Sequence, residues 1–247
     1  MKKFVVSCSL LILLAISASA QKTKPWTEWS VKDAEKVLND SAWGQTQTEG
    51  GGTEDATQTS AITSTTAARE GQVKNAKTAA TAGESGDKKE GAIAHFRVRF
   101  LTAKPIRAAF VRKVELQGAP AERVAQLKSF VDRDFGDYIV ITITMDGNDT
   151  KRMAPVAQGL TAADVNTLKD VTYLERKDGK RVQLVDYRPP IQDGLGAKFV
   201  FPRTFEGKPF IEATSGEVRF AMEMGKAFKI NRRFKVADMM YDGKLEF

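Results

Sequence analysis

The feature that most limits what this chain can fold into is a segment, residues 45–91, that lacks the side chains from which protein cores are built. It contains no Phe, Tyr, Trp, Leu or Met, and its large apolar residues are confined to Ile62 and Val73. Such a segment cannot bury enough apolar surface to offset the conformational entropy that it would lose on ordering. We therefore predict a disordered low-complexity linker over residues 45–91, with the fold built from the residues on either side.

Residues 1–20 have the three parts of a bacterial signal peptide. A positively charged start precedes an apolar stretch from Phe4 to Ile16, and the segment ends in Ala18-Ser19-Ala20, with small residues where a signal peptidase requires them. No later stretch approaches the ~20 apolar residues that a membrane-spanning helix needs. We therefore expect an exported protein without a transmembrane span, located in the periplasm or outside the cell.

The single cysteine limits both the stabilisation and the chemistry of the exported chain. Cys8 is the only cysteine, and it lies inside the predicted signal peptide. Removal of the signal leaves no disulfide, no thiolate metal ligand and no cysteine nucleophile. The fold must therefore be held together by a hydrophobic core.

Residues 21–44 form a distinct segment, and all three tryptophans of the chain lie there, namely Trp26, Trp29 and Trp43. Ser30 followed by Asp33 predicts a capping box that begins a short helix over residues 31–39. Exposed tryptophans are costly, so another surface should cover them. Two interpretations remain open: the three tryptophans bind a partner protein, or they form a clasp that folds back onto the same chain.

The tryptophan segment also resembles the opening segment of a set of uncharacterised exported bacterial proteins. The resemblance covers residues 24–43 and rests on the run Trp-Thr-Glu-Trp-Ser-Val-Lys-Asp, followed by the second tryptophan motif at Trp43. Some of these proteins are grouped with the GWxTD type, but this chain contains no Gly-Trp-x-Thr-Asp. The resemblance implies that the segment is a module with a docking or assembly role. No activity of these proteins is inferred for this chain.

Residues 92–247 carry most of the core-forming side chains. Phe96, Val98 and Phe100 alternate with two arginines, which predicts a strand with one buried face. Pro105 and Pro120 each open a predicted helix, because proline is favoured in the first turn. Residues 138–145 form the most β-prone run of the chain and predict a central strand.

After these helices the pattern changes to strands. A hairpin is predicted around Asp178-Gly179, because this dipeptide supplies the positive φ of a tight turn. Thr161 and Asp164 are predicted to cap another short helix, and further strands fit residues 198–201, 210–213, 217–224, 228–237 and 245–247. This order predicts an α+β domain over residues 92–247. It would consist mostly of antiparallel β-sheet with two or three helices clustered in its N-terminal half.

The chain is poor in catalytic and metal-binding side chains. His95 is its only histidine, so a Ser-His-Asp triad would have to use it, and a zinc site would lack further nitrogen or sulfur ligands. Acidic residues gather in two groups, Asp132, Asp134, Asp137 and Asp146, Asn148, Asp149. The second group fails the calcium-loop pattern, which requires glycine and glutamate where Lys151 and Ala157 stand. We expect no metal and no cofactor.

The net charge of +7 points to an anionic partner. Arg97 and Arg99 share one face of a predicted strand, and Arg233 and Lys235 lie on another. If those strands are neighbours, the four side chains form a surface that binds an anionic envelope polymer. The alternative is an ordinary solvated strand face.

The function that these patterns favour is non-enzymatic: interaction or assembly in the cell envelope, with an envelope protein or an anionic envelope polymer as partner. No nucleic-acid recognition motif occurs, so we expect no nucleic acid. One alternative is a hydrolase of envelope polysaccharide that acts through carboxylates such as Asp132, Asp134 and Asp137. The other is a periplasmic small-ligand binder, which would need a sizeable apolar pocket.

Overall fold

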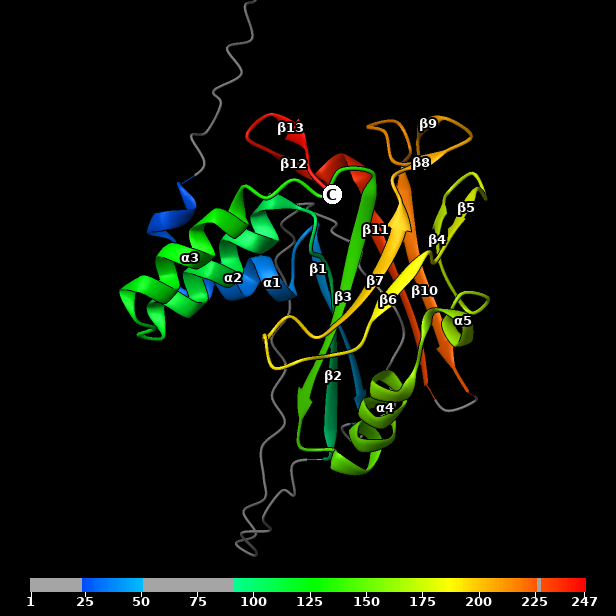
Figure 1. Ribbon diagram of the computed structural model, residues 1–247, viewed down its shortest axis with the longest axis horizontal. Coiled ribbons are helices and arrows are strands. Elements are labelled where there is room, and N and C mark those ends of the chain that lie inside the picture. Colours follow the sequence, from blue (N-terminus) through cyan, green and yellow to red (C-terminus); the bar gives the residue numbers. More distant parts are fainter. Residues whose placement is uncertain (1–23, 51–90, 226–227) are drawn as a thin grey trace, which may run out of the picture.

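The computed structural model describes residues 24–50, 91–225 and 228–247 (Figure 1). The predicted signal peptide and most of the predicted linker, residues 51–90, lie outside these residues. Within the described ranges the helices are α1 (Val31–Asn39), α2 (Lys104–Leu116), α3 (Ala121–Val131), α4 (Thr150–Ala162) and α5 (Val165–Leu168), with 3-10 turns η1 (Trp26–Glu28) and η2 (Val236–Asp238).

The strands form two antiparallel sheets, which makes the fold α+β, as the sequence predicts. Sheet A has the order β1-β2-β3-β7-β6, with β1 (Gly44–Gly50), β2 (Ile93–Phe100), β3 (Tyr138–Gly147), β7 (Ala197–Pro202) and β6 (Asp186–Arg188). Sheet B has the order β11-β10-β4-β5, with β11 (Phe228–Lys235), β10 (Glu217–Met224), β4 (Thr172–Arg176) and β5 (Arg181–Gln183). Two small hairpins pair β8 (Thr204–Phe205) with β9 (Lys208–Pro209) and β12 (Met240–Tyr241) with β13 (Lys244–Leu245).

The core lies between the two sheets and is rich in phenylalanine. The alternation predicted for β2 is confirmed, because its Phe96, Val98 and Phe100 are fully buried. The ring of Phe96 lies 4.6 Å from that of Phe228 on β11, and the ring of Phe100 lies 4.9 Å from that of Phe234. The first pair is tilted and the second is edge-on, and aromatic pairs of this kind stabilise a core beyond the area that they bury.

Helices α1, α2 and α3 lie together on the left of Figure 1, on the opposite side of the molecule from β4, β5 and β10. α1 packs against α2. Just before α1 begins, the carbonyl of Trp29 accepts a hydrogen bond from the guanidinium Nε of Arg112 on α2, at 2.8 Å. α1 also lies directly on the start of β1. A Cβ atom at Gly44 would stand 2.4 Å from the Leu38 carbonyl oxygen, so a residue without a side chain is required there.

The boundary predicted for the linker is wrong for residues 45–50, because they form β1. β1 pairs with β2 along its whole length, from Gly44 opposite Arg99 to Gly50 opposite Ile93. Two of its side chains also bridge to sheet B: the amide of Gln45 donates to the Arg233 carbonyl at 2.7 Å, and Gln47 donates to Lys229 in the same way at 2.8 Å. The segment is ordered by hydrogen bonds, which a criterion based on apolar burial does not detect.

The tryptophan segment is part of the same fold as residues 91–247, because β1 and α1 pack directly on that part. The predicted capping box of α1 is confirmed: the Ser30 hydroxyl accepts from the Asp33 amide at 3.2 Å, and the Asp33 carboxylate accepts from the Ser30 amide at 2.9 Å. The helices predicted after Pro105 and Pro120 and the hairpin at Asp178-Gly179 are also present.

Two predictions about local structure differ from the observed fold. The helix cap predicted at Thr161 is wrong, because Thr161 lies in the last turn of α4; this helix was not predicted, and Asp149 caps it by accepting from the Arg152 amide at 3.0 Å. Asp164 caps α5 instead. The strand predicted at residues 210–213 is absent, because that part of the described chain is an irregular connection. In the described part of the chain, no helix has the length and apolar character needed to cross a membrane.

Candidate functional site

The three tryptophans are used inside the chain's own fold. Trp29 is 8% exposed, and Trp26 and Trp43 are partly buried against the core. The indole N–H of Trp29 donates to the Lys24 carbonyl at 3.0 Å, and that of Trp43 donates to the Glu246 carbonyl at 2.8 Å. This arrangement is an intramolecular clasp. The partner-binding interpretation loses its basis for Trp29 and Trp43, because their rings already pack on their own chain.

The four residues of the predicted anionic-binding surface come from two different sheets. Arg97 and Arg99 lie on β2 of sheet A, and Arg233 and Lys235 lie on β11 of sheet B. The prediction assumed neighbouring strands, but β2 does not pair with β11; β1 pairs with β2 and reaches β11 through the side chains of Gln45 and Gln47. Arg97 is paired with Asp146 at 2.9 Å.

Arg99 has a structural role that connects α1 to sheet A. Its guanidinium donates to the Leu38 carbonyl at 2.8 Å, to the Asn39 side chain at 2.8 Å and to the Thr144 hydroxyl at 2.9 Å. Desolvation by burial lowers the pKa of Arg99 to about 10. A side chain that is enclosed and satisfied in this way is not available to an external polymer.

Of the residues considered for catalysis, Asp132 and Asp134 line one pocket beside Glu246, whereas His95 lies elsewhere. His95 is half-buried on β2, with its Nδ1 atom 3.0 Å from the Thr48 hydroxyl of β1. Asp132 pairs with Lys104 at 2.7 Å, and the Asp134 carboxylate accepts from the Gly136 amide at 2.9 Å. Among the described residues, no three His, Cys, Asp or Glu side chains gather as a metal site would require.

A group of charged side chains lies on the outward side of sheet B. Strand register aligns Arg181, Glu175, Arg219 and Arg233 in one row across β5, β4, β10 and β11. Glu217 and Lys235 form the next pair along β10 and β11, and Lys177 lies beside them. We call this set the basic face; its members are Arg181, Glu175, Arg219, Arg233, Glu217, Lys235 and Lys177.

The centre of the basic face is held rigidly by hydrogen bonds. The Glu175 carboxylate accepts from Arg181 Nε at 2.7 Å and from Arg219 Nη2 at 2.6 Å. The same two guanidinium groups flank Tyr173, at 4.3 Å and 5.6 Å from the centre of its ring. One carboxylate and one aromatic ring therefore position two arginines that come from strands on either side of β4.

We expect the carboxyl group of Glu175 to titrate below its ordinary pKa of 4.5. The hydrogen bond from Arg219 is the largest cause, since it favours the charged form. Because the pKa is lowered by folding, this group stabilises the fold above the pKa of the unfolded chain. That stabilisation is lost as the pH falls through the lower folded pKa. A carboxyl NMR titration of the protein and of Arg219→Gln checks this; an unchanged Glu175 pKa in the variant contradicts it.

The basic face is open to solvent at its β11 edge. Arg233 and Lys235 are exposed, and in the described part of the chain neither takes part in an ion pair. A hollow of about 190 Å³ lies beside them. It is lined by Glu175, Arg176, Lys177, Glu217, Arg219 and Arg233. The face thus combines fixed arginines at its centre with free cations at its edge.

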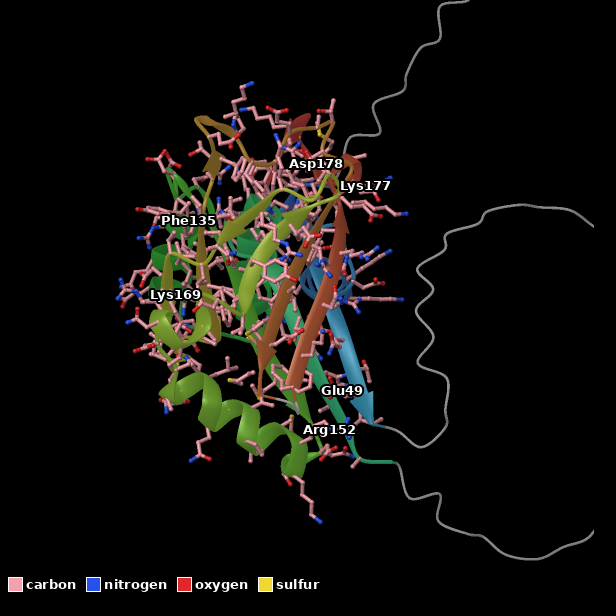
Figure 2. The ribbon with its side chains drawn as sticks, turned by 90° about the vertical axis from the view of Figure 1, so that its right-hand side faces the viewer. Glu49, Phe135, Arg152, Lys169, Lys177 and Asp178 are labelled. Carbon is pink, nitrogen blue, oxygen red and sulfur yellow. The ribbon has the colours of Figure 1, made fainter. Side chains whose placement is uncertain are left out.

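A separate cavity of about 590 Å³ lies between α4 and the ends of β1, β10 and β11. Its apolar lining includes Val156, Met224 and Phe228, and an ion pair between Glu49 and Arg152 stands at 3.4 Å beside it. Figure 2 shows Glu49 and Arg152 at one end of the molecule, far from Lys177 and Asp178 at the other. This cavity has the size and the partly apolar lining that a binder of small ligands would require.

Comparison with known proteins assigns no family to this chain. No protein-family model matches it, and no curated protein matches it. One similar solved structure is the crystal structure of a novel protein of unknown function from Burkholderia pseudomallei K96243. It has a TM-score of 0.36 and 10% sequence identity, and the match covers 56% of this chain and 72% of that chain. The candidate site therefore rests on the chain's own residues.

Sequence reasoning found only part of this site. It selected Arg233 and Lys235, together with Arg219, as basic residues on predicted strands, and it predicted the hairpin that joins β4 to β5. It missed Arg181 and Glu175, although the hairpin prediction already places them opposite one another. Pairing of β4 with β10, which brings Arg219 beside Glu175, has no local signal in the sequence.

Proposed function

We propose that this protein is an exported, non-enzymatic binding protein whose basic face associates with an anionic polysaccharide of the cell envelope. Export follows from the signal-like residues 1–20, and the resemblance of residues 24–43 to exported bacterial proteins supports it. The observation that carries the binding role is the row of three arginines, Arg181, Arg219 and Arg233, on an exposed sheet surface.

The charge of the basic face suits a polyanion. Its members comprise five cations and two carboxylates, and both carboxylates lie within the rows of cations. Neighbouring strands are about 4.8 Å apart, so Arg219 and Arg233 are one strand spacing apart, and Arg181 follows two spacings from Arg219 with Glu175 between them. An extended chain with regularly spaced carboxylates can therefore contact several guanidinium groups at once, which neutralises them without requiring a deep pocket.

The surroundings of Tyr173 favour a polysaccharide over a single-stranded nucleic acid. Proteins that bind single strands use exposed aromatic rings on which the bases stack. Tyr173 is flanked by Arg181 and Arg219, so its ring is already engaged with cations of the same chain. Recognition at this face therefore depends on charge and not on base stacking.

The test compares two variants that each remove two positive charges. Arg233→Ser with Lys235→Ser changes the basic face, and Arg123→Ser with Lys169→Ser changes exposed sites elsewhere. We expect the first pair to weaken binding to polygalacturonate about fivefold to tenfold at low salt, since each exposed charge contact contributes up to about 1 kcal/mol. The affinity of this variant should also depend less steeply on salt.

The control pair should bind polygalacturonate almost as well as the unchanged protein. Equal weakening by both variants would show that net charge alone is responsible, and it would overturn the assignment to the basic face. Tighter binding of single-stranded DNA than of polygalacturonate, at equal salt, would contradict the choice of polymer.

A further inference from the structure

A second pocket, distinct from the basic face, lies where the start of α2, the end of α3 and the end of β7 meet the last residues of the chain. Its volume is about 460 Å³. Figure 2 labels Phe135, one of its lining residues, on the side of the molecule away from Lys177. Four of its lining side chains are cationic: Lys104, Arg107, Arg133 and Arg203.

Arg107 is the deepest of these cations and is 4% exposed. Its Nε donates to the Val131 carbonyl at 3.0 Å, and its Nη1 donates to the carbonyls of Leu101, at 3.1 Å, and of Thr102. Its third nitrogen, Nη2, makes no hydrogen bond within the described ranges, and the side chain takes part in no ion pair there. Three carbonyls thus hold a buried guanidinium in place and leave one of its donor groups for the pocket.

Arg203 stands on the other side of the same pocket and is also incompletely satisfied. Its Nη2 donates to the Phe247 carbonyl oxygen at 2.9 Å, and its guanidinium lies 4.7 Å from the centre of the Phe247 ring. Its Nε is buried and has no hydrogen-bond partner in the described structure. Arg133 completes the set, 5.5 Å from the Phe135 ring that Arg107 approaches from 5.2 Å.

The pocket also carries three carboxylates, Asp132, Asp134 and Glu246, so its lining has one more cation than anion. Asp132 pairs with Lys104 at 2.7 Å, whereas Glu246 and Asp134 accept from the backbone amides of Lys104 and Gly136 and keep their negative charge. The attraction for an entering anion therefore comes from the hydrogen-bond donors that Arg107 and Arg203 leave unused and not from uncompensated charge.

We propose that this pocket binds a small molecule through a carboxylate or phosphate group held by Arg107 and Arg203, with Arg133 at its entrance. The planar guanidinium forks match the geometry of either oxyanion. The site does not depend on the basic face, which belongs to the other sheet and is aimed at a polymer.

The test is a titration of the full chain with inorganic phosphate and with succinate, each at constant ionic strength. The readouts are the thermal midpoint and the side-chain Nε–H NMR signals of the arginines. We expect a saturable rise in the midpoint, because a ligand that binds only the folded state stabilises it. The signals of Arg107 and Arg203 should shift along the same saturation curve, and the anion that saturates at the lower concentration identifies the preferred group.

Three variants make this test specific. Arg133→Gln removes the exposed cation at the entrance, and we expect it to raise the dissociation constant about tenfold while the protein stays folded. Arg203→Gln should abolish saturation. Arg123→Gln, on the exposed side of α3, should leave the titration unchanged. The proposal is overturned if the unchanged protein shows no saturable shift, or if all three variants bind both anions as well as it does.

Discussion

A chain that lacks residues 24–50 will fail to reach a cooperative native state. The deletion removes Trp29, Ala34 and Leu38, which are all buried in the core. Burial of a large apolar side chain contributes about 1.5–3 kcal/mol, and a domain has about 5–15 kcal/mol of net stability. Removal of Trp29 and Leu38, together with the contacts that they make, therefore removes a large part of the net stability.

The same deletion also damages sheet A directly. β2 would lose its partner β1 and become an exposed edge, and Arg99 would lose its bonds to Leu38 and Asn39. An unpaired strand edge favours association with other chains. We therefore expect the truncated protein to aggregate or to unfold without a sigmoidal transition. Circular dichroism during urea unfolding and size-exclusion chromatography measure this result.

The control replaces residues 53–88 by a short Gly-Ser connector. Gly50 lies opposite Ile93 in the β1–β2 pair, so a short turn can join the two strands. If the replaced residues are the predicted linker, shortening the loop should raise the free energy of unfolding by roughly 1 kcal/mol, because the loop shortens by about two halvings and each halving gains about 0.6 kcal/mol. A cooperative fold in the truncated chain would contradict our view that residues 24–50 belong to the core. Loss of folding in the connector variant would contradict the linker prediction.

Phe220→Ala will lower the free energy of unfolding by about 3–5 kcal/mol, the cost of removing a buried phenyl ring from a packed core. Phe220 is fully buried on β10 and joins the two sheets. Its ring lies 5.7 Å from that of Phe199 and 6.2 Å from that of Phe201, both on β7. The substitution opens a cavity between the sheets that neighbouring side chains fill only in part.

Urea unfolding of the variant measures this loss, and Leu116→Ala provides the control. Leu116 ends α2 and is 39% exposed, so its substitution should cost well under 1 kcal/mol. A cost below about 1 kcal/mol for Phe220→Ala would show that the two sheets do not share one packed core. It would then be necessary to revise the arrangement on which the basic face depends.

The elements that the sequence predicted correctly are those specified by neighbouring residues. Ser30 and Asp33 define the start of α1, prolines mark the starts of α2 and α3, and Asp178-Gly179 closes the β4–β5 hairpin. The alternation in β2 identified the buried face correctly. In each case the determining interaction spans a few residues, so the pattern can be read without the fold.

α4 shows where local rules stop. It contains Pro155 and Gly159, two residues that weaken a helix, and its sequence therefore gives a poor signal. The helix is set by its contacts: Val156 and Leu160 are buried, and a Cβ atom at Gly159 would stand 2.8 Å from the sulfur of Met224. The glycine is thus explained by a strand that lies far away in the sequence.

By itself the sequence determined the α+β class, the positions of most strands and the alternation of buried and exposed side chains, because these follow from local periodicity and turn chemistry. Only the tertiary structure decided which strands are neighbours. It placed Arg97 and Arg99 on a different sheet from Arg233, made residues 45–50 a strand of sheet A, and brought Arg107 and Arg203 to one pocket. Strand pairing and burial depend on contacts between distant residues, and a single sequence carries no local signal for them.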